Sequence, residues 1–228
     1  YESIHLNISW ATLNCDGDCV IDARGIDQRA VVIDNAINTT IEGFTIPGDA
    51  TMYAGVVITP SCSMVNVSAN TIYGMGLSNP SNDSPLAYGI LTYGNDQYDM
   101  PTGLCLCENE IYGIGGSGIS LGDYTAGTTI VNNFIHDIVP VDFLEESLSV
   151  GVQANFAVGV TIENNYFENM IISANLPASL GWMGGNEHVM VLSYLSTTNP
   201  SQIEFNDDVD YWMAESTVDV FGFTFDLV

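Results

Sequence analysis

The stretch Ile130-Val-Asn-Asn133-Phe-Ile135-His-Asp137 carries a pattern that recurs along the chain. The pattern consists of apolar residues, an Asn, and a short aromatic or aliphatic run that ends near Gly or Asp. Its other clear copies are Val67-Ser-Ala-Asn70-Thr-Ile72-Tyr-Gly74, Leu106-Cys-Glu-Asn109-Glu-Ile111-Tyr-Gly113 and Ile162-Glu-Asn-Asn165-Tyr-Phe167-Glu-Asn169, with looser copies around Gly43 and Asn206. A recurrence of this kind indicates a repeat architecture.

Each copy follows a short aliphatic run that mostly begins at a small residue. The runs are Ala30-Val-Val-Ile33, Gly55-Val-Val-Ile58, Gly89-Ile-Leu91, Gly118-Ile-Ser-Leu121, Gly151-Val-Gln153 and Val189-Met-Val-Leu192. Such runs are typical of buried strands, and no sustained helical periodicity is present. Two or three short strands with small turn residues form one coil of a solenoid. We therefore predict stacked coils over about residues 8–210 of a single domain that spans 1–228.

The repeated asparagines Asn70, Asn109, Asn133 and Asn165 are predicted to stack at one corner of the coils. Asn tolerates the left-handed conformation of a corner, and its amide can bond to the Asn of the next coil. An interior column of Ile72, Ile111, Ile135 and Phe167 would accompany this ladder. The unequal spacing of the copies predicts protruding loops at about 74–87, 94–103, 139–148 and 172–187.

The alternation of Gly-Ile/Val-x-Leu/Ile with x-x-Asn-Asn-x-Ile/Phe resembles the coil repeat of right-handed parallel β-helices, as in pectate lyases and their relatives. The phrase Cys19-Val-Ile-Asp-Ala-Arg-Gly25 resembles a phrase in the first coil of that group. The resemblance implies an all-β, single-stranded right-handed parallel β-helix of about seven or eight coils. It implies little about function, because that scaffold hosts lyases, hydrolases, adhesins and structural proteins. A β-sandwich is the alternative all-β architecture.

The charge balance excludes several classes of partner. The chain has 28 acidic residues, no Lys and only Arg24 and Arg29 as basic residues, for a formal charge of −26. Nucleic acids and anionic lipids both require cations that this chain lacks. Acidic polysaccharides would be repelled unless a metal bridged them. No run of about 18 apolar residues is present, so no membrane-spanning helix is expected.

A carbohydrate-active enzyme is the main alternative to a structural protein. Lyases of the resembled group use a basic residue, and this chain offers basic residues only near its N-terminus. Hydrolysis needs only two carboxylates, and the candidates are Asp16 with Asp18, Asp99, Asp123, Glu145 with Glu146, and Asp207 with Asp208. The ordered phrases of galacturonase-like hydrolases are missing, and His136 is predicted to be a surface or stacking residue. These features favour a non-enzymatic function.

The five cysteines and the acidic pairs offer cross-links and metal ligands. We expect a Cys15–Cys19 disulfide, with Asp16 and Asp18 as an incomplete calcium loop. Asp208 and Asp210 are further candidates for a structural Ca²⁺ or another divalent cation. Cys105 and Cys107 alternate along one strand and are not expected to bond to each other, so Cys62 is the predicted partner of one of them. The remaining thiol would be either intermolecular or buried and inert.

Three acceptor patterns for N-glycosylation, at Asn7, Asn38 and Asn66, favour an extracellular setting together with the cysteines and the acidity. The chain opens without Met or a signal sequence, and we interpret it as a processed polypeptide or a fragment.

The final segment, 216–228, predicts a strand with one apolar face formed by Phe221, Phe223, Phe225 and Leu227. Such a strand at the end of a solenoid favours edge-to-edge stacking of successive molecules. The predicted function is therefore a self-associating structural protein of a cell-surface layer, sheath or filament. In composition and strand pattern the chain is also similar to sheath and surface-layer proteins of some archaea. A third interpretation is a glycan-binding adhesin module that uses Tyr53, Tyr73, Tyr93, Tyr98 and Trp182.

Overall fold

The computed structural model describes residues 2–76, 86–122, 124–143, 146–170, 172–176, 179–187, 191–192, 195–196, 199–200 and 202–205. The regular secondary structure within these residues consists of β-strands, without any α-helix. This part of the chain accordingly contains no helix that is long and apolar enough to cross a membrane. The all-β prediction is confirmed.

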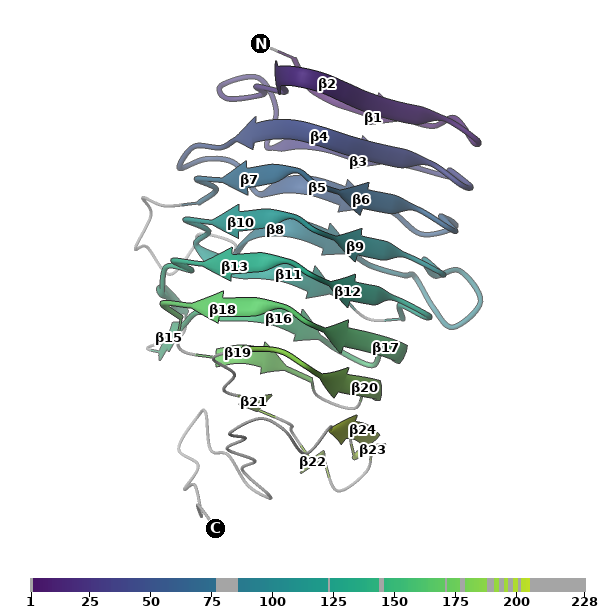
Figure 1. Ribbon diagram of the computed structural model, residues 1–228, viewed down its shortest axis with the longest axis vertical. Coiled ribbons are helices and arrows are strands. Elements are labelled where there is room, and N and C mark those ends of the chain that lie inside the picture. The colour runs from purple at the N-terminus through teal and green to yellow at the C-terminus, as the bar shows by residue number, and fades with distance from the viewer. Residues whose placement is uncertain are drawn as a thin grey trace.

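The first sheet contains one strand from each successive coil (Figure 1). Its eight strands, in spatial order, are β1 (Ile4–Leu6), β3 (Arg29–Ile33), β5 (Ala54–Ile58), β8 (Ala87–Thr92), β11 (Gly116–Leu121), β16 (Val150–Ala154), β19 (Ile172–Asn175) and β21 (Val191–Leu192). All neighbouring strands in it are parallel and in register, as in Val31↔Val56↔Ile90↔Ile119↔Val152.

The second sheet consists of two columns of strands that the long strand β4 joins. The first column is formed by β2 (Thr12–Val20), β4 (Thr40–Pro47), β6 (Asn66–Ser68), β9 (Cys105–Cys107), β12 (Thr129–Val131), β17 (Val158–Glu163), β20 (Leu180–Gly184) and β24 (Gln202–Phe205). The second column continues from β4 through β7 (Thr71–Tyr73), β10 (Glu110–Tyr112), β13 (Phe134–His136) and β18 (Tyr166–Glu168). Each coil thus passes through the first sheet, the first column and the second column in turn, which confirms a parallel β-helix.

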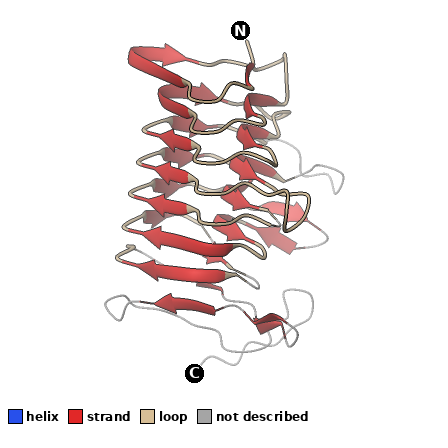
Figure 2. Ribbon diagram, turned by 90° about the vertical axis from the view of Figure 1, so that its right-hand side faces the viewer, coloured by secondary structure: helices blue, strands red, loops and turns tan. Residues whose placement is uncertain are grey.

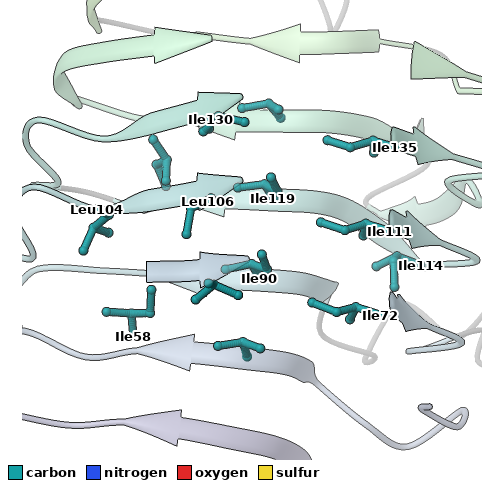
Figure 3. Close-up of a cluster of buried hydrophobic side chains, with 14 of the residues drawn as sticks. Ile58, Ile72, Ile90, Leu104, Leu106, Ile111, Ile114, Ile119, Ile130 and Ile135 are labelled. Atoms are coloured by element: carbon teal, nitrogen blue, oxygen red, sulfur yellow. The ribbon is translucent and has the colours of Figure 1, made fainter. Parts of the chain in front are cut away.

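A column of isoleucines and a column of glycines pack against each other inside the coils. Ile72, Ile111 and Ile135 are fully buried and aligned in register, and Figure 3 shows them in successive coils. A Cβ atom on Gly118 of the first sheet would lie 2.7 Å from Ile135 Cγ2 and 2.8 Å from the Gly151 carbonyl oxygen. A Cβ atom on Gly55, Gly89 or Gly151 would likewise lie less than 3 Å from side-chain and backbone atoms of neighbouring residues. This close approach explains why the aliphatic runs begin at small residues.

The ladder asparagines stack between the two columns of the second sheet. Asn109 donates from its backbone N–H and its Nδ2 to Asn133 Oδ1 at 2.9 and 3.1 Å, and Asn133 donates in the same way to Asn165 Oδ1 at 2.9 Å each. Asn70 donates to Asn109 Oδ1 in the same way. A further member, Asn186, accepts from Asn165 at 2.9 Å. Residues 70, 109, 133, 165 and 186 are each at most 3% exposed.

Two details of the predicted ladder are wrong. The left-handed residue of the corner is not the ladder Asn but the residue before it, as in Ala69, Glu108, Asn132 and Asn164 (φ 53° to 58°). In the coil of β4, Gly43 (φ 82°) takes this left-handed position, and the next residue, Phe44, donates its N–H to Asn70 Oδ1 at 3.0 Å. The looser copy around Gly43 is therefore aligned one residue too early.

The predicted loop at 172–187 is also wrong, because it contains β19 and β20. Its Pro and Gly residues are typical of turns, but β19 pairs in parallel with β16 in the first sheet, and β20 pairs in parallel with β17 in the first column. Two antiparallel hairpins branch from the coils: β14 (Val141–Phe143) with β15 (Glu146–Leu148), and β22 (Leu195–Ser196) with β23 (Asn199–Pro200).

Candidate functional site

The cysteines pair within single strands. Cys15 and Cys19 form a disulfide in β2, where the register to β4 shifts between Asn14 and Cys19. Cys105 and Cys107 also form a disulfide, which corrects the expected pairing with Cys62. Because Leu106 points into the core, both thiols lie on the outer face, and their Cα atoms are 5.7 Å apart, within the range of a disulfide.

Cys62 is the free thiol. It is 1% exposed, and burial raises its pKa. A thiol that is both buried and protonated does not cross-link molecules, so the intermolecular alternative is excluded for the folded chain.

The metal candidates do not converge in the described structure. Asp16 and Asp18 are exposed on β2, and the described residues contain no group of three His, Cys, Asp or Glu side chains that could hold an ion. Asp208 and Asp210 lie outside the described residues, as do the catalytic candidates Asp123, Glu145 and Asp207. The predicted assembly strand with Phe221, Phe223, Phe225 and Leu227 also lies outside them.

The three glycosylation candidates differ in exposure. Asn7 and Asn38 are exposed, whereas Asn66 is half-buried and donates from Nδ2 to Ser68 Oγ at 3.1 Å.

The five aromatic residues predicted to bind glycans do not gather on one flank. Tyr53 packs edge-on against Tyr88 on the first sheet, with ring centroids 5.3 Å apart, and Tyr73 lies in the second column. Trp182 is half-buried in β20. Tyr93 and Tyr98 are exposed by 40% and 88%, and both lie in the turn between β8 and β9.

That turn belongs to a surface that we call the aromatic edge. It is the corner at which each coil passes from the first sheet into the first column, and Figure 2 faces its stacked turns. Thirteen large hydrophobic side chains are exposed in the described structure, and ten of them lie on this edge. They are Ile8, Trp10, Ile37, Met64, Tyr93, Tyr98, Tyr124, Phe156, Val158 and Leu180. Trp10 is 75% exposed, and Tyr124 and Phe156 are 42% and 47% exposed.

The aromatic edge is built as regularly as the sheets beside it. One residue of each turn pairs with its equivalent in the next turn, in the order Ile37↔Ser63↔Thr102↔Ala126↔Val158. Backbone N–H groups tie consecutive turns together, as from Asn38 to Ser63 O (2.9 Å) and from Gly127 to Val158 O (2.8 Å). The exposed rings therefore project from a rigid backbone.

The carboxylates of the aromatic edge are engaged in local hydrogen bonds. Asp34 accepts from Thr59 Oγ1 at 2.6 Å, and Asp96 accepts from the backbone N–H of Tyr98 at 2.7 Å. Asp99 accepts from the Ser61 hydroxyl and from Asn95 Nδ2, and these two bonds hold its pKa below the ordinary value. The other polar side chains on these turns, among the residues that the structure describes, are amides and hydroxyls, including Asn35, Asn38 and Ser61.

A second aromatic group on the outer face of the second column is self-contained. Tyr73 stacks on Tyr112, and Tyr112 stacks on His136, with centroids 5.0 and 4.9 Å apart. Phe134 stacks on His136 at 4.1 Å, and His136 Nδ1 lies 2.8 Å from Asp137 Oδ2. His136 is therefore a stacking residue, as predicted. Because these rings cover each other's faces, this group offers mainly ring edges to a ligand.

The sequence contained part of the signal for the aromatic edge. Tyr93 and Tyr98 are two of the predicted glycan-binding aromatic residues, and Tyr98 falls in the loop predicted at about 94–103. Trp10, Tyr124 and Phe156 lie far apart in the sequence, and only the coil register brings them onto one corner.

Comparison with solved structures shows the same architecture. PfbA, a surface adhesin of Streptococcus pneumoniae, is 14% identical, and the match covers 87% of this chain and 57% of that one with a TM-score of 0.57. The Dettilon tailspike protein is 12% identical, with coverage of 78% and 39% and a TM-score of 0.50. The chain thus spans less than two thirds of either protein.

No curated protein matches the sequence of this chain. The family model described as a right-handed beta helix region matches residues 54–175, more than half of the chain. These residues include the clear copies of the Asn pattern and five strands of the first sheet. The chain belongs to the right-handed β-helix family.

Proposed function

We propose that the chain is an extracellular surface protein that binds an uncharged polysaccharide along the aromatic edge. The observation that carries this proposal is that ten of the thirteen exposed large hydrophobic side chains in the described structure share that one corner. Exposed apolar patches of this kind mark interaction sites. Aromatic rings can pack against the apolar faces of sugar rings, while amides and hydroxyls bond to the sugar hydroxyl groups.

The charge of the protein selects the kind of polysaccharide. With a formal charge of −26 and no Lys, the chain repels polyanions. Both arginines are already paired, Arg24 with Asp22 at 2.6 Å and Arg29 with Asp27 at 3.4 Å. An uncharged sugar polymer avoids this repulsion and matches the amide and hydroxyl groups of the edge.

An extracellular location is supported by the two disulfides and by the exposure of Asn7 and Asn38. Disulfides persist in oxidising compartments, and glycosylation acceptors require accessible asparagines in secreted proteins.

The test is a binding titration against β-linked glucan and β-linked mannan, with polygalacturonate as the acidic probe. We expect one of the neutral polymers to bind and polygalacturonate not to bind. A variant with Trp10→Ala, Tyr124→Ala and Phe156→Ala should lose about tenfold or more in affinity. The matched control, Tyr73→Ala with Tyr112→Ala, removes rings of the other aromatic group and should keep the affinity. Equal loss in both variants, or binding of polygalacturonate alone, would refute the proposal.

A second candidate is the self-associating envelope protein, stabilised by coil-to-coil stacking. The observation that favours it is the first coil, where β1 pairs only with β3 and β2 only with β4 among the described strands. The core-facing residues Ile4, Leu6 and Leu13 of this coil are only partly buried. A strand edge above an apolar surface is a template for another coil, either from a second copy or from a preceding segment of the same polypeptide.

Sedimentation tests this second candidate. If a second copy covers the first coil, the chain should form polymers that Leu6→Asp dissociates. Because all four bonded cysteines pair internally and Cys62 is buried, a reductant alone should not dissolve them. If bound divalent cations stabilise the polymers, as predicted, a chelator should lower their sedimentation coefficient. A monomer at all concentrations would refute this candidate and leave the polysaccharide proposal untouched.

A further inference from the structure

The outer face of the first column places a polar pair beside the Cys105–Cys107 disulfide. Asn66 pairs in register with Cys105, and Ser68 pairs in register with Cys107. Asn66 donates from Nδ2 to Ser68 Oγ at 3.1 Å, so the Ser68 hydroxyl keeps its own proton to donate. The Asn66 Oδ1 atom is buried, and the described part of the chain provides it with no hydrogen-bond partner. A disulfide has no proton to donate and leaves this acceptor unused.

The reduced form of the pair would use both polar groups. Residues paired across neighbouring strands lie about 4.8 Å apart, within reach of these short side chains. A thiol at Cys105 has a proton that Asn66 Oδ1 can accept, and a thiolate at Cys107 can accept the proton of Ser68 Oγ. A buried acceptor without a partner is unfavourable. The surroundings of the disulfide therefore suit the dithiol better than the oxidised pair.

The disulfide adds little to the stability of the fold. Only one residue separates its two cysteines, and the shortest loops gain the least stability from closure. Strand β9 is held by other interactions, since Cys105 N–H donates to Val65 O at 2.9 Å and Leu106 is fully buried. β9 also pairs with β6 on one side and with β12 on the other. Reduction therefore leaves the backbone in place, with the two Cα atoms 5.7 Å apart and ready for reoxidation.

We propose that Cys105 and Cys107 form a redox-active pair that exchanges with the thiols of another molecule. A thiolate attacks Cys105 Sγ, because Cys105 is half-buried whereas Cys107 is only 7% exposed. The bond between the two sulfur atoms breaks, Cys107 leaves as a thiolate, and Cys105 enters a mixed disulfide. A second thiolate attacks the external sulfur of that mixed disulfide and releases Cys105. The pair thereby gains two electrons and two protons, and two external thiols are oxidised to a disulfide.

The carboxylates around the pair select the charge of the external thiol. Glu108 follows the pair directly and is exposed, and Glu42 and Glu163 lie in the same outward-facing row as Cys107. Neither of the two arginines lies in a strand of this sheet. An acidic thiol is repelled by this surface. The substrate is therefore a neutral or basic thiol.

The experiment treats the folded, oxidised chain with cysteamine, a basic thiol, or with mercaptoacetate, an acidic one. Alkylation and mass spectrometry then measure the reduction of each disulfide. The internal control is Cys15–Cys19, whose cysteines pack against the core cluster. We expect Cys105–Cys107 to be reduced about tenfold faster than the control or more, while the circular dichroism stays native. At low ionic strength the thiolate of cysteamine should react about threefold faster than that of mercaptoacetate, or more.

Matched variants identify the attacked sulfur and the acceptor. Cys107→Ser leaves the Cys105 thiol alone, and Cys105→Ser leaves the Cys107 thiol alone. With the neutral probe 2,2′-dithiodipyridine, the Cys105 thiol should react about tenfold faster or more. Asn66→Ala should lower the equilibrium constant for reduction by about threefold or more, because the dithiol loses its acceptor. Its control is Thr161→Ala, in the same row but two coils from Cys105, which should leave the constant unchanged.

Three results would overturn the exchange site: equal rates at the two disulfides, reduction only as the native circular dichroism is lost, or two free thiols at these positions in the oxidised protein. Equal reactivity of the two single thiols would overturn attack at Cys105. An unchanged equilibrium constant in Asn66→Ala would overturn the role of Asn66. Mercaptoacetate that reacts as fast as cysteamine would overturn the preference for a neutral or basic thiol.

Discussion

The Asn133 side chain connects three coils. Its Oδ1 accepts from two donors of Asn109, and its Nδ2 donates to Leu106 O at 2.8 Å and to Asn165 Oδ1 at 2.9 Å. We expect Asn133→Ala to lower the free energy of unfolding by about 3 kcal/mol, because it leaves several buried groups without partners. Chemical denaturation measures this change.

The neighbouring Asn132 provides the control for that measurement. It is exposed and has φ 56°, and Ala69 occupies the equivalent position in another coil. Asn132→Ala should therefore cost less than about 1 kcal/mol. A similar loss in both variants would contradict a specific role for the ladder amides.

The Tyr98 turn should open in acid. Hydrogen bonds from Ser61 and Asn95 lower the pKa of Asp99 below the ordinary 3.8. A lowered pKa in the folded state contributes stability that is present above the ordinary value and is lost as the pH falls through the lowered one. We expect the protection of the amides around Tyr98, measured relative to their intrinsic exchange rates, to fall as the pH drops below about 4, and Asp99→Asn to remove most of this pH dependence. Protection that stays constant down to about pH 2 would contradict this role of Asp99.

At the scale of the elements, the glycine column of the first sheet fixes how closely the strands approach. Gly118→Ala would place a Cβ atom 2.7 Å from Ile135 Cγ2 and 2.8 Å from a backbone oxygen. We expect a loss of about 2–3 kcal/mol in the free energy of unfolding, as for overpacked cores. Gly127→Ala, which only strains a left-handed φ of 61°, should cost about 1 kcal/mol. If Gly118→Ala costs no more than Gly127→Ala, the close contact does not determine the packing.

The strands differ in how well the sequence predicts them. β5 and β8 were predictable because aliphatic runs follow Gly55 and Gly89. β20, with the sequence Leu180-Gly-Trp-Met-Gly184, has the composition of a turn, and its strand conformation depends on its neighbours β17 and β24. The sequence does not reveal Asn186 for a related reason, since it lacks the large apolar residue that stands two positions after Asn70, Asn109, Asn133 and Asn165.

The disulfide between Cys105 and Cys107 shows a second limit. Alternation along a strand correctly places both thiols on one face. The distance between them depends on local backbone geometry, which the pattern of residues does not encode.

At the scale of the whole molecule, the charge of −26 should make stability and binding respond differently to salt. Raising the ionic strength from about 0.01 to 0.1 M shortens the screening length from about 30 to 10 Å. The melting temperature should rise because repulsion between carboxylates is screened. Polysaccharide affinity should change less than about twofold, because the aromatic edge binds an uncharged ligand. A steep fall of affinity with salt would indicate ionic binding instead.

The solenoid itself follows from the repeated residues, whereas the candidate site follows from their three-dimensional register. Trp10, Tyr124 and Phe156 lie in turns whose lengths vary, and nothing near them in the sequence marks them as one surface. The stacking of the turns places all three on the same corner, with Trp10 in the first turn and Tyr124 and Phe156 in the adjacent fifth and sixth turns.

Trp10 offers the most direct test of the account, because it is 75% exposed on the aromatic edge. The fluorescence emission of Trp10 is obtained by subtracting the spectrum of Trp10→Phe from that of wild type. Both spectra are recorded while the neutral polysaccharide that binds is titrated into the protein. The account predicts a blue shift of this emission and protection from acrylamide quenching that saturate with the same Kd as binding. Saturable binding that leaves the emission and quenching of Trp10 unchanged would contradict it.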